Sequence, residues 1–278
     1  MFARFQLIRP LNLLFIILGQ CALLMHLIES NAAIQGFFLI FSTILSAAAG
    51  YVINDIFDIK ADFVNRPTRP LVSGKISKTN AIVFYLTLLL SSLFIAYYAA
   101  IPGLLAVVVF INIALFFYAL FVKRTAIVGN LLVSVCVGMV FIVCNLLAET
   151  PSILASGIGI FATAANFIRE NFKSIEDFAG DKIASFRTLP VLIGSKNAMI
   201  ATGFISLVFG GILLYRAIYP ITPEVSTIAW ALIAIIGGSA FFLIGIMALR
   251  NPDIVTAKKL SLITKFVMLI VIMLIFLL

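Results

Sequence analysis

Hydrophobic residues form nine long runs along the chain, separated by short polar segments. A run of about 20 apolar residues is long enough for a helix that crosses a membrane. Helix-breaking pairs such as Pro102-Gly103, Pro151-Ser152 and Asn251-Pro252 lie between the runs. The pattern therefore predicts nine membrane-spanning helices, over residues 8–28, 36–57, 80–99, 102–121, 127–148, 152–173, 197–218, 226–249 and 260–278.

The overall composition supports this interpretation. Hydrophobic residues make up 63% of the 278 residues, and the mean hydropathy is +1.22, whereas soluble domains are about 45–50% apolar. The first run lacks a small-residue cleavage site, so we expect a membrane span there and not a cleaved signal peptide. Cys21, Cys136 and Cys144 lie inside apolar runs without metal-binding spacing, so we expect them to be packing residues.

The charged residues predict how the chain is oriented. The net charge is +8, but the basic residues lie in short loops between spans, which argues against a nucleic-acid partner. Except for Arg216, every Lys and Arg falls on one side of the nine predicted spans, and so does every Asp. By the positive-inside rule that side is cytoplasmic. We therefore expect a bacterial or archaeal plasma-membrane protein with its N-terminus inside, its C-terminus outside and any chemistry facing the cytoplasm.

A cluster of acidic residues ends the second run. Asp55, Asp58 and Asp62 are spaced i, i+3, i+7, and Asn54 lies four residues before Asp58. On a continuous helix these residues share one stripe. Like charges at the end of an apolar helix need a cation, a basic side chain or water to offset them.

A second acidic pair, Asp177 and Asp181, follows the sixth run. Each acidic segment is followed by an arginine, a glycine and a lysine before the next run. We interpret this as a weak parallel repeat, with motifs near 54–75 and 177–196, within a single domain over 1–278. Such a repeat would bring two equivalent helix ends to one cavity; the alternative is a coincidence between two short loops.

Two facing acidic helix ends would suit Mg²⁺, which binds oxygen ligands and keeps open positions for substrate phosphates. Basic side chains on the same side could bind the remaining phosphate oxygens of a diphosphate. These are Lys123, Arg124, Arg66, Arg69, Lys173, Lys182 and Arg187. The chain has no glycine-rich phosphate loop, so we do not expect a nucleotide triphosphatase.

Most of the other polar and aromatic residues in the runs are interpreted as packing residues. His26 is predicted at the outer end of the first span, so the sequence offers no histidine base. Among the 26 phenylalanines, Phe57 is the best candidate to face the acids, and Tyr51 lies one turn before Asp55. Asparagines in the spans are expected to satisfy helix contacts.

The acidic motifs resemble a known family. Asn54-Asp55-x-x-Asp58-x-x-x-Asp62 is similar to the first motif of the UbiA superfamily of intramembrane prenyltransferases. Residues 65–77 resemble the loop that follows in that family, residues 169–181 resemble its second motif, and Thr188-Leu189-Pro190 continues the match. Ser174 stands where family members often have an acid, and a serine oxygen is a weaker metal ligand than a carboxylate.

This resemblance implies an α-helical bundle around a central cavity that opens sideways to lipid, with short cytoplasmic cap helices. It implies Mg²⁺-dependent transfer of a prenyl group from a polyprenyl diphosphate to a lipid acceptor, with no obligatory protein partner. The implied catalytic residues are Asp55, Asp58, Asp177 and Asp181. The implied metal ligands are these four with Asn54 and Asp62. The candidate substrate-binding residues are Asn54, Tyr51, Arg66, Arg69, Tyr118, Lys123, Asn130, Lys173 and Lys182.

The acceptor is indicated by residues 118–130. This segment is similar to the branch of the family that prenylates geranylgeranylglyceryl phosphate, and it lacks the Pro-Gln element of the 4-hydroxybenzoate branch. We therefore expect an ether-forming transfer to a glycerol phosphate lipid. The alternatives are an aromatic acceptor of quinone, haem or chlorophyll synthesis, an ion-coupled carrier, and a noncatalytic scaffold. A carrier is expected to place its acids near the midplane, whereas these acids lie at helix ends.

Overall fold

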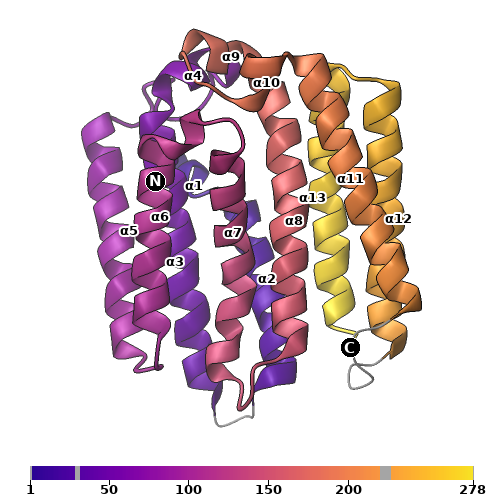
Figure 1. Ribbon diagram of the computed structural model, residues 1–278. Coiled ribbons are helices and arrows are strands. Elements are labelled where there is room, and N and C mark those ends of the chain that lie inside the picture. Colours follow the sequence, from indigo (N-terminus) through magenta and orange to yellow (C-terminus); the bar gives the residue numbers. More distant parts are fainter. Residues whose placement is uncertain (1, 29–31, 220–226, 278) are drawn as a thin grey trace.

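Figure 1 shows a computed structural model of the chain, which describes residues 2–28, 32–219 and 227–277. In this part the chain forms 13 α-helices and two short 3₁₀ helices. The nine long helices are α2 (Pro10–Leu27), α3 (Ala33–Phe57), α5 (Lys78–Tyr98), α6 (Leu104–Leu120), α7 (Val128–Ile142), α8 (Ile153–Glu176), α11 (Ser195–Ile218), α12 (Thr227–Arg250) and α13 (Ile254–Ile275). The short ones are α1 (Phe2–Leu7), α4 (Ile59–Asn65), η2 (Val122–Arg124), η3 (Val143–Leu147), α9 (Phe178–Ile183) and α10 (Leu189–Ile193).

Each of the nine predicted runs corresponds to one long helix, but several predicted boundaries were wrong. Helix α13 begins well before residue 260, because the Asp253 carboxylate accepts a hydrogen bond from the backbone N of Thr256 at 2.8 Å and caps the helix there. Helix α8 continues past residue 173 to Glu176. Helix α7 ends at Ile142, and the chain goes on as η3.

Six of the described helices are both long enough and apolar enough to cross a membrane: α2, α3, α5, α7 with η3, α11, and α12 from Trp230 to Arg250. Helix α6 has the same apolar character but is only 17 residues long. Helices α8 and α13 are long, but α8 carries charged side chains in its last eight residues and α13 carries lysines in its first twelve. The chain is thus an integral membrane protein with multiple apolar helices.

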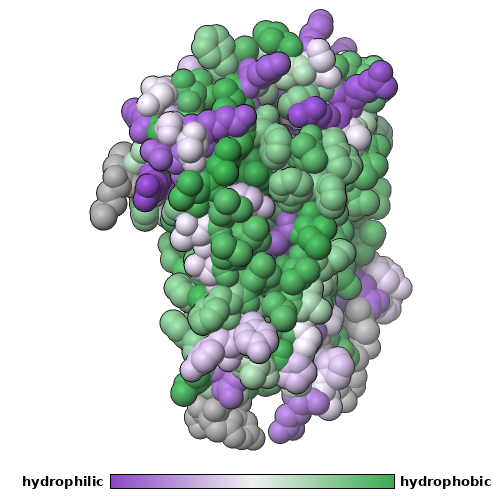
Figure 2. All heavy atoms as spheres, turned by 90° about the vertical axis from the view of Figure 1, so that its left-hand side faces the viewer, coloured by the Kyte–Doolittle hydropathy of each residue, from purple (hydrophilic) through white to green (hydrophobic). Residues whose placement is uncertain are grey.

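The outer surface of the bundle is apolar. Leu90, Phe110 and Val208 are each more than half exposed, and Figure 2 shows a broad hydrophobic surface with hydrophilic residues towards its two ends, most densely at the top. Soluble monomers rarely expose apolar patches of this size. A lipid environment accounts for this surface.

Close helix packing holds the bundle together. Helix α8 lies in its middle, and its Phe172 side chain is fully buried. Helices α11 and α12 approach closely at Gly210, where an added Cβ would lie 2.6 Å from the backbone N of Phe242. Small residues permit such contacts between membrane helices. At the end opposite α4, α9 and α10, His26 Nε2 lies 2.9 Å from the carbonyl oxygen of Ile275 and so links α2 to α13.

Helices α4, α9 and α10 cover one end of the bundle (Figure 1), and we call this group the cap. The cap is formed by the segments that follow α3 and α8. Short helices of this kind were expected from the family resemblance. Helices α4 and α9 touch at Gly180, where an added Cβ would lie 2.3 Å from Asn65 Nδ2. Gly180 has no side chain, so the segments that follow α3 and α8 can lie side by side at this contact.

Candidate active site

The first acidic segment spans a break between two helices. Helix α3 ends at Phe57, and Asp58 (φ −91°, ψ 0°) joins it to α4. The backbone N of Asp58 donates to Asn54 O at 3.0 Å, and that of Asp62 donates to Asp58 O at 2.8 Å. These bonds keep helical spacing across the break. The three carboxylates therefore stay on one side of the chain, and Asp55, Asp58 and Asp62 are 4%, 3% and 3% exposed.

Each of these buried carboxylates is paired with a basic side chain. Asp55 Oδ1 accepts hydrogen bonds from Arg9 Nη2 at 2.6 Å and from Arg69 Nη1 at 3.0 Å. Arg69 also donates to Asp62, and Lys123 donates to Asp58. Burying a carboxylate without such partners would be strongly unfavourable. Arg9, Arg69 and Lys123 therefore neutralise the first segment in this state.

Asp58 has a second partner close by in the sequence. Asn54 Nδ2 donates to Asp58 Oδ2 at 2.8 Å, and Asn54 Oδ1 lies 3.4 Å from Lys123 Nζ. The amide thus contacts both members of the Asp58–Lys123 ion pair. This is the proximity that the i, i+4 spacing predicted.

The second acidic segment is bound directly to the first. Arg66, which follows α4, donates to Asp177 with both terminal nitrogens, at 3.0 Å (Nη1 to Oδ2) and 2.9 Å (Nη2 to Oδ1). Asn65 Nδ2 donates to Asp177 O at 3.0 Å, and the backbone N of Gly180 donates to Asn65 Oδ1 at 3.0 Å. Two segments far apart in the sequence therefore converge under the cap.

Asp181 differs from the other acids. It is buried, and no salt bridge to it is found within the described part of the chain. Burial, reinforced by the negative charge of Asp177, raises the pKa of the Asp181 carboxyl to about 6. A proton therefore occupies this group through much of the mildly acidic range.

The donor set matches what Mg²⁺ requires, although the acids are now held by cations. Carboxylate and amide oxygens from both segments lie at one end of the bundle, and these are the ligands that Mg²⁺ prefers. In the described residues, no three Asp, Glu, His or Cys side chains are grouped closely enough to hold a metal ion in this arrangement. Ligation by Asn54, Asp55, Asp58, Asp62, Asp177 and Asp181 stays a prediction.

Ser174, the departure from the family pattern, forms hydrogen bonds to α7 and to its own helix. Its Oγ donates to Glu170 O at 2.9 Å and accepts from Asn130 Nδ2 at 3.2 Å. Asn130 also donates to Asn171 Oδ1 at 3.2 Å. Asn130, expected to bind substrate, therefore holds α7 against α8 in this structure.

A central cavity begins beside the acids and runs into the bundle. It offers about 120 Å³ to the centres of water-sized molecules, which is room for several of them. Its deeper wall is apolar and comes from α3, α6 and α7, with residues such as Ile111, Leu115 and Val137. Polar groups line its cap end: Arg9, Asn12, Tyr51, Asn54, Tyr118, Asn166, Arg169, Glu170 and Lys173.

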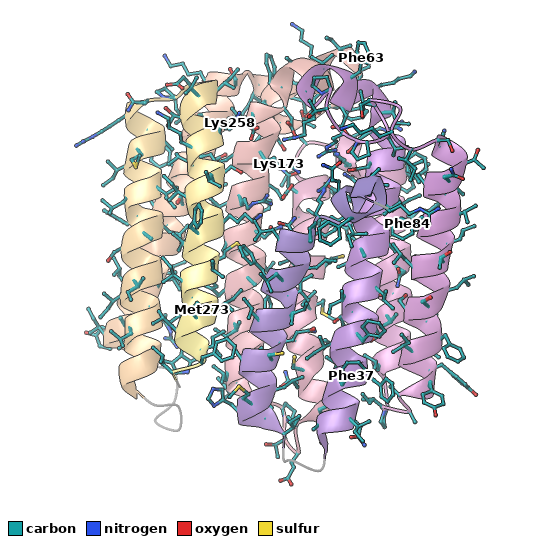
Figure 3. The ribbon with its side chains drawn as sticks, turned by 180° about the vertical axis from the view of Figure 1, so that it is seen from behind. Phe37, Phe63, Phe84, Lys173, Lys258 and Met273 are labelled. Atoms are coloured by element: carbon teal, nitrogen blue, oxygen red, sulfur yellow. The ribbon has the colours of Figure 1, made fainter. Side chains whose placement is uncertain are left out.

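A second cavity lies between α2, α8 and α13, and we call it the basic hollow. It shares Arg9, Asn12, Arg169 and Lys173 with the central cavity. Its other polar lining residues are Arg66, Arg69, Glu176, Ser261 and Lys265. Figure 3 shows Lys173 extending from α8 below the cap. The two cavities therefore meet at a wall of basic side chains.

Sequence reasoning missed part of this wall. It did not select Arg9, Asn12, Arg169, Glu170 or Lys265 as site residues. The charged residues among them could have been recognised by their position in or next to an apolar run. A charged side chain there is costly, so it marks a functional site by default. Glu170 now pairs with Arg169 at 2.5 Å and with Lys173 at 3.5 Å.

Some predicted site residues are not brought to the acids. Lys182 is exposed, and its Nζ lies 6.0 Å from the centre of the Phe178 ring. Phe57 packs edge-on against Phe116 at 6.2 Å, outside the cavity lining. Tyr51 and Tyr118, in contrast, line the central cavity. Helix direction decides these outcomes, because neighbouring residues face different sides.

Comparisons with known proteins agree with this architecture. The sequence profile of the UbiA prenyltransferase family matches residues 12–275. The digeranylgeranylglyceryl phosphate synthase of Methanobrevibacter smithii is 32% identical over 280 residues, covering 95% of this chain and 93% of that protein. A solved digeranylgeranylglyceryl phosphate synthase structure superposes with a TM-score of 0.71 at 27% identity, covering 99% of this chain and 96% of its own.

One further solved structure has the same fold. A UbiA homologue from Archaeoglobus fulgidus, bound to GPP and Mg²⁺, superposes with a TM-score of 0.65. It is 16% identical and covers 99% of this chain and 100% of its own. At this identity the likeness shows a common fold.

Proposed function

Because the chain belongs to the UbiA prenyltransferase family, we propose that it transfers a geranylgeranyl group from geranylgeranyl diphosphate to geranylgeranylglyceryl phosphate. The observation that carries this proposal is the convergence of the two acidic segments, through Arg66 and Asp177, next to a largely apolar cavity that Asn54 of the first segment lines. A prenyl diphosphate has the same two parts, a charged head and an apolar tail. The relatives that act as digeranylgeranylglyceryl phosphate synthases support this acceptor.

The diphosphate head fits beneath the cap. Mg²⁺ would be held by Asn54, Asp55, Asp58 and Asp62 of the first segment and by Asp177 and Asp181 of the second. When bound there it would offset the negative charge that develops on the leaving diphosphate. Arg66, Arg69 and Lys123 already lie on these carboxylates, and they would bind phosphate oxygens instead.

The prenyl tail fits the deeper, apolar part of the central cavity. In the reaction, the bond between the allylic carbon and the diphosphate oxygen breaks, and the diphosphate leaves with the electron pair. The acceptor hydroxyl oxygen then bonds to that carbon and gives its proton to the released diphosphate. Little basicity is needed, because the proton becomes acidic as the new bond forms. The Tyr118 ring lines this cavity, and an aromatic face stabilises positive charge.

We also propose that all nine long helices cross the membrane, with the cap on the cytoplasmic side. The distribution of basic residues supports this orientation, because Lys and Arg gather at the cap end while Arg216 lies near the other end of α11. Helices α8 and α13 carry charges because they line the two cavities. Charged residues within a membrane usually face such interior spaces.

Purified protein tests the proposed reaction directly. We expect radiolabelled geranylgeranyl diphosphate, Mg²⁺ and geranylgeranylglyceryl phosphate to give a labelled ether lipid, and EDTA to stop its formation. 4-Hydroxybenzoate in place of the lipid acceptor should give no product. A product formed with the aromatic acceptor, and none with the glycerol phosphate lipid, would overturn the acceptor assignment.

A further inference from the structure

Lys265 occupies an unusual position in α13. It lies 11 residues into the helix, about three turns from its start, in a segment that we propose crosses the membrane. Its Nζ donates to Asn12 Oδ1 at 2.6 Å. Within the described part of the chain it forms no salt bridge. An unneutralised lysine at this depth is costly and calls for an anionic ligand.

The basic side chains of α8 and α13 exceed the acids that face them. Arg169, Lys173 and Lys265 line the basic hollow. Arg169 and Lys173 share a single carboxylate, that of Glu170. Glu176 also lines the hollow, but it pairs with Arg66 at 3.7 Å. Among the described residues, Arg169, Lys173 and Lys265 therefore have one carboxylate to offset three positive charges, and the excess matches the charge of about −2 on a phosphate monoester.

The Arg169 guanidinium also has a free donor. Its Nε is buried, and no hydrogen-bond partner for it is found among the described residues. Buried donors are nearly always satisfied, so an unsatisfied one needs an explanation. A bound oxygen ligand in the adjoining hollow would supply the missing acceptor.

The hollow is also correctly placed for a second substrate. It opens between α2 and α13, beside Pro10, Leu11 and Ser261. Arg9 forms part of the wall that it shares with the central cavity, and Arg9 donates to Asp55 of the first acidic segment. Arg66 and Arg69, which we propose bind the diphosphate, also line the hollow. A phosphate held by Lys265 and Arg169 would thus be a neighbour of the diphosphate, on the side of the hollow formed by α8 and α13.

We propose that Lys265, Arg169 and Lys173 form a separate subsite for the phosphate monoester of the acceptor lipid. The inference rests on the proposed function. It assigns the diphosphate to the acidic segments with Arg66 and Arg69, and the acceptor phosphate to the side of the basic hollow that α8 and α13 form. Lys265 would then determine acceptor specificity, because it favours phosphorylated acceptors over the corresponding free alcohols.

Steady-state kinetics of the full-length K265M variant test the subsite. We expect KM for geranylgeranylglyceryl phosphate to rise about tenfold or more, the usual effect of losing one charged hydrogen bond. KM for geranylgeranyl diphosphate should not change. With geranylgeranylglycerol, which lacks the phosphate, wild type and K265M should react equally slowly. The conservative K265R variant should recover most of the affinity for the phosphorylated acceptor.

Lys258 supplies a matched control. It lies on the same helix, is exposed and sits at the cap end in Figure 3. The K258M variant removes the same charge from α13 and should leave both KM values unchanged. Equal thermal unfolding temperatures for wild type, K265M and K258M would show that neither change acts through the fold.

Direct binding separates failure of the subsite from failure of the proposed reaction. Titration of geranylgeranylglyceryl phosphate into the wild type and K265M, without diphosphate, should show binding about tenfold weaker in the variant. If the wild type makes the ether lipid and K265M has an unchanged KM for the acceptor, the subsite is refuted and the function stands. If the titrations differ but no acceptor is prenylated, the proposed reaction is refuted. A raised KM for geranylgeranyl diphosphate would instead assign the hollow to the donor and overturn the inference.

Discussion

The two acidic segments share one location, but they differ in how their charges are balanced. In the first, Asp55, Asp58 and Asp62 are all buried and all paired with Arg9, Arg69 or Lys123. In the second, Asp177 is paired with Arg66. Asp181 has no such partner in the described structure, and a serine stands at position 174.

If the two segments hold Mg²⁺ as we propose, this difference predicts that they hold it unequally. Asp181, with a pKa of about 6, must be deprotonated before it can bind Mg²⁺ in mildly acidic solution. The first segment offers three carboxylates and the Asn54 amide, whereas the second offers two carboxylates. The first segment should therefore supply most of the metal affinity. The second should make binding dependent on pH.

Removing one charge from the first segment should have the largest effect. In the D58N variant the amide oxygen can still accept a hydrogen bond from Lys123, but the charge for metal binding is gone. We expect kcat to fall about a thousandfold or more, because a metal contributes several kcal/mol to stabilising the leaving group. Product formation from labelled geranylgeranyl diphosphate measures this.

Asp253 provides the control for that variant. It is exposed and caps α13, so D253N removes an aspartate outside the site and should retain normal turnover. Size-exclusion chromatography and thermal unfolding would show that D58N is folded. Turnover of folded D58N at the wild-type rate would mean that Asp58 does not bind the metal.

The same change in the second segment should cost less. We expect D181N to lower kcat about tenfold to a hundredfold, the range seen when a group that supports a metal site is lost. A higher Mg²⁺ concentration should recover part of the rate in D181N but not in D58N. The prediction is tested by titrating Mg²⁺ against initial rate for both variants. If D58N and D181N lose the same fraction of kcat and added Mg²⁺ restores neither, the two segments do not differ in metal binding as proposed.

The pH dependence of Mg²⁺ binding should separate the segments further. Below a pH of about 6, Asp181 is protonated in the metal-free protein. The apparent Mg²⁺ affinity should therefore rise as the pH increases from 5 to 7 and then level off, by up to about tenfold per pH unit on the acid side for one released proton. Calorimetric titration of Mg²⁺ in several buffers would report both the affinity and the proton release.

The linked effect on stability has the opposite sign. A raised carboxyl pKa means that folding favours the protonated form. The metal-free protein should therefore lose stability as the pH rises from the unfolded value near 4 through the folded value of about 6. The D181N variant should not show this loss. An unchanged pH profile of thermal unfolding in D181N would assign the dependence to another group.

The sequence predicted the fold and the acidic segments because both depend on local patterns. Runs of about 20 apolar residues identify helices, and the spacing of Asp55, Asp58 and Asp62 survives the break after Phe57 because backbone hydrogen bonds continue across it. The helix ends were less predictable. Helix α13 begins at a hydrogen bond from the backbone N of Thr256 to the Asp253 carboxylate. The pattern of apolar residues does not indicate where such a bond forms.

The basic hollow could not be predicted because it depends on packing between distant helices. Arg9, Arg169 and Lys265 lie on three different helices or their ends and meet only after α2, α8 and α13 pack together. Lys182 illustrates the reverse case. It is next to Asp181 in sequence, but successive helical residues face different directions, and its side chain is exposed.

Replacing Ser174 should give the smallest effect and the sharpest comparison of the two segments. The Ser174 Oγ accepts a hydrogen bond from Asn130 Nδ2, and a carboxylate in S174D can accept the same bond while adding a second negative charge near Asp177. We expect S174D to lower the Mg²⁺ concentration for half-maximal rate by about twofold to tenfold, since the added charge favours the metal-bound state. The S174N variant, which adds similar volume without charge, should leave that concentration unchanged. If S174D requires as much Mg²⁺ as the wild type while remaining folded, residue 174 is a packing position between α7 and α8, and the weakness of the second segment must come from Asp181 alone.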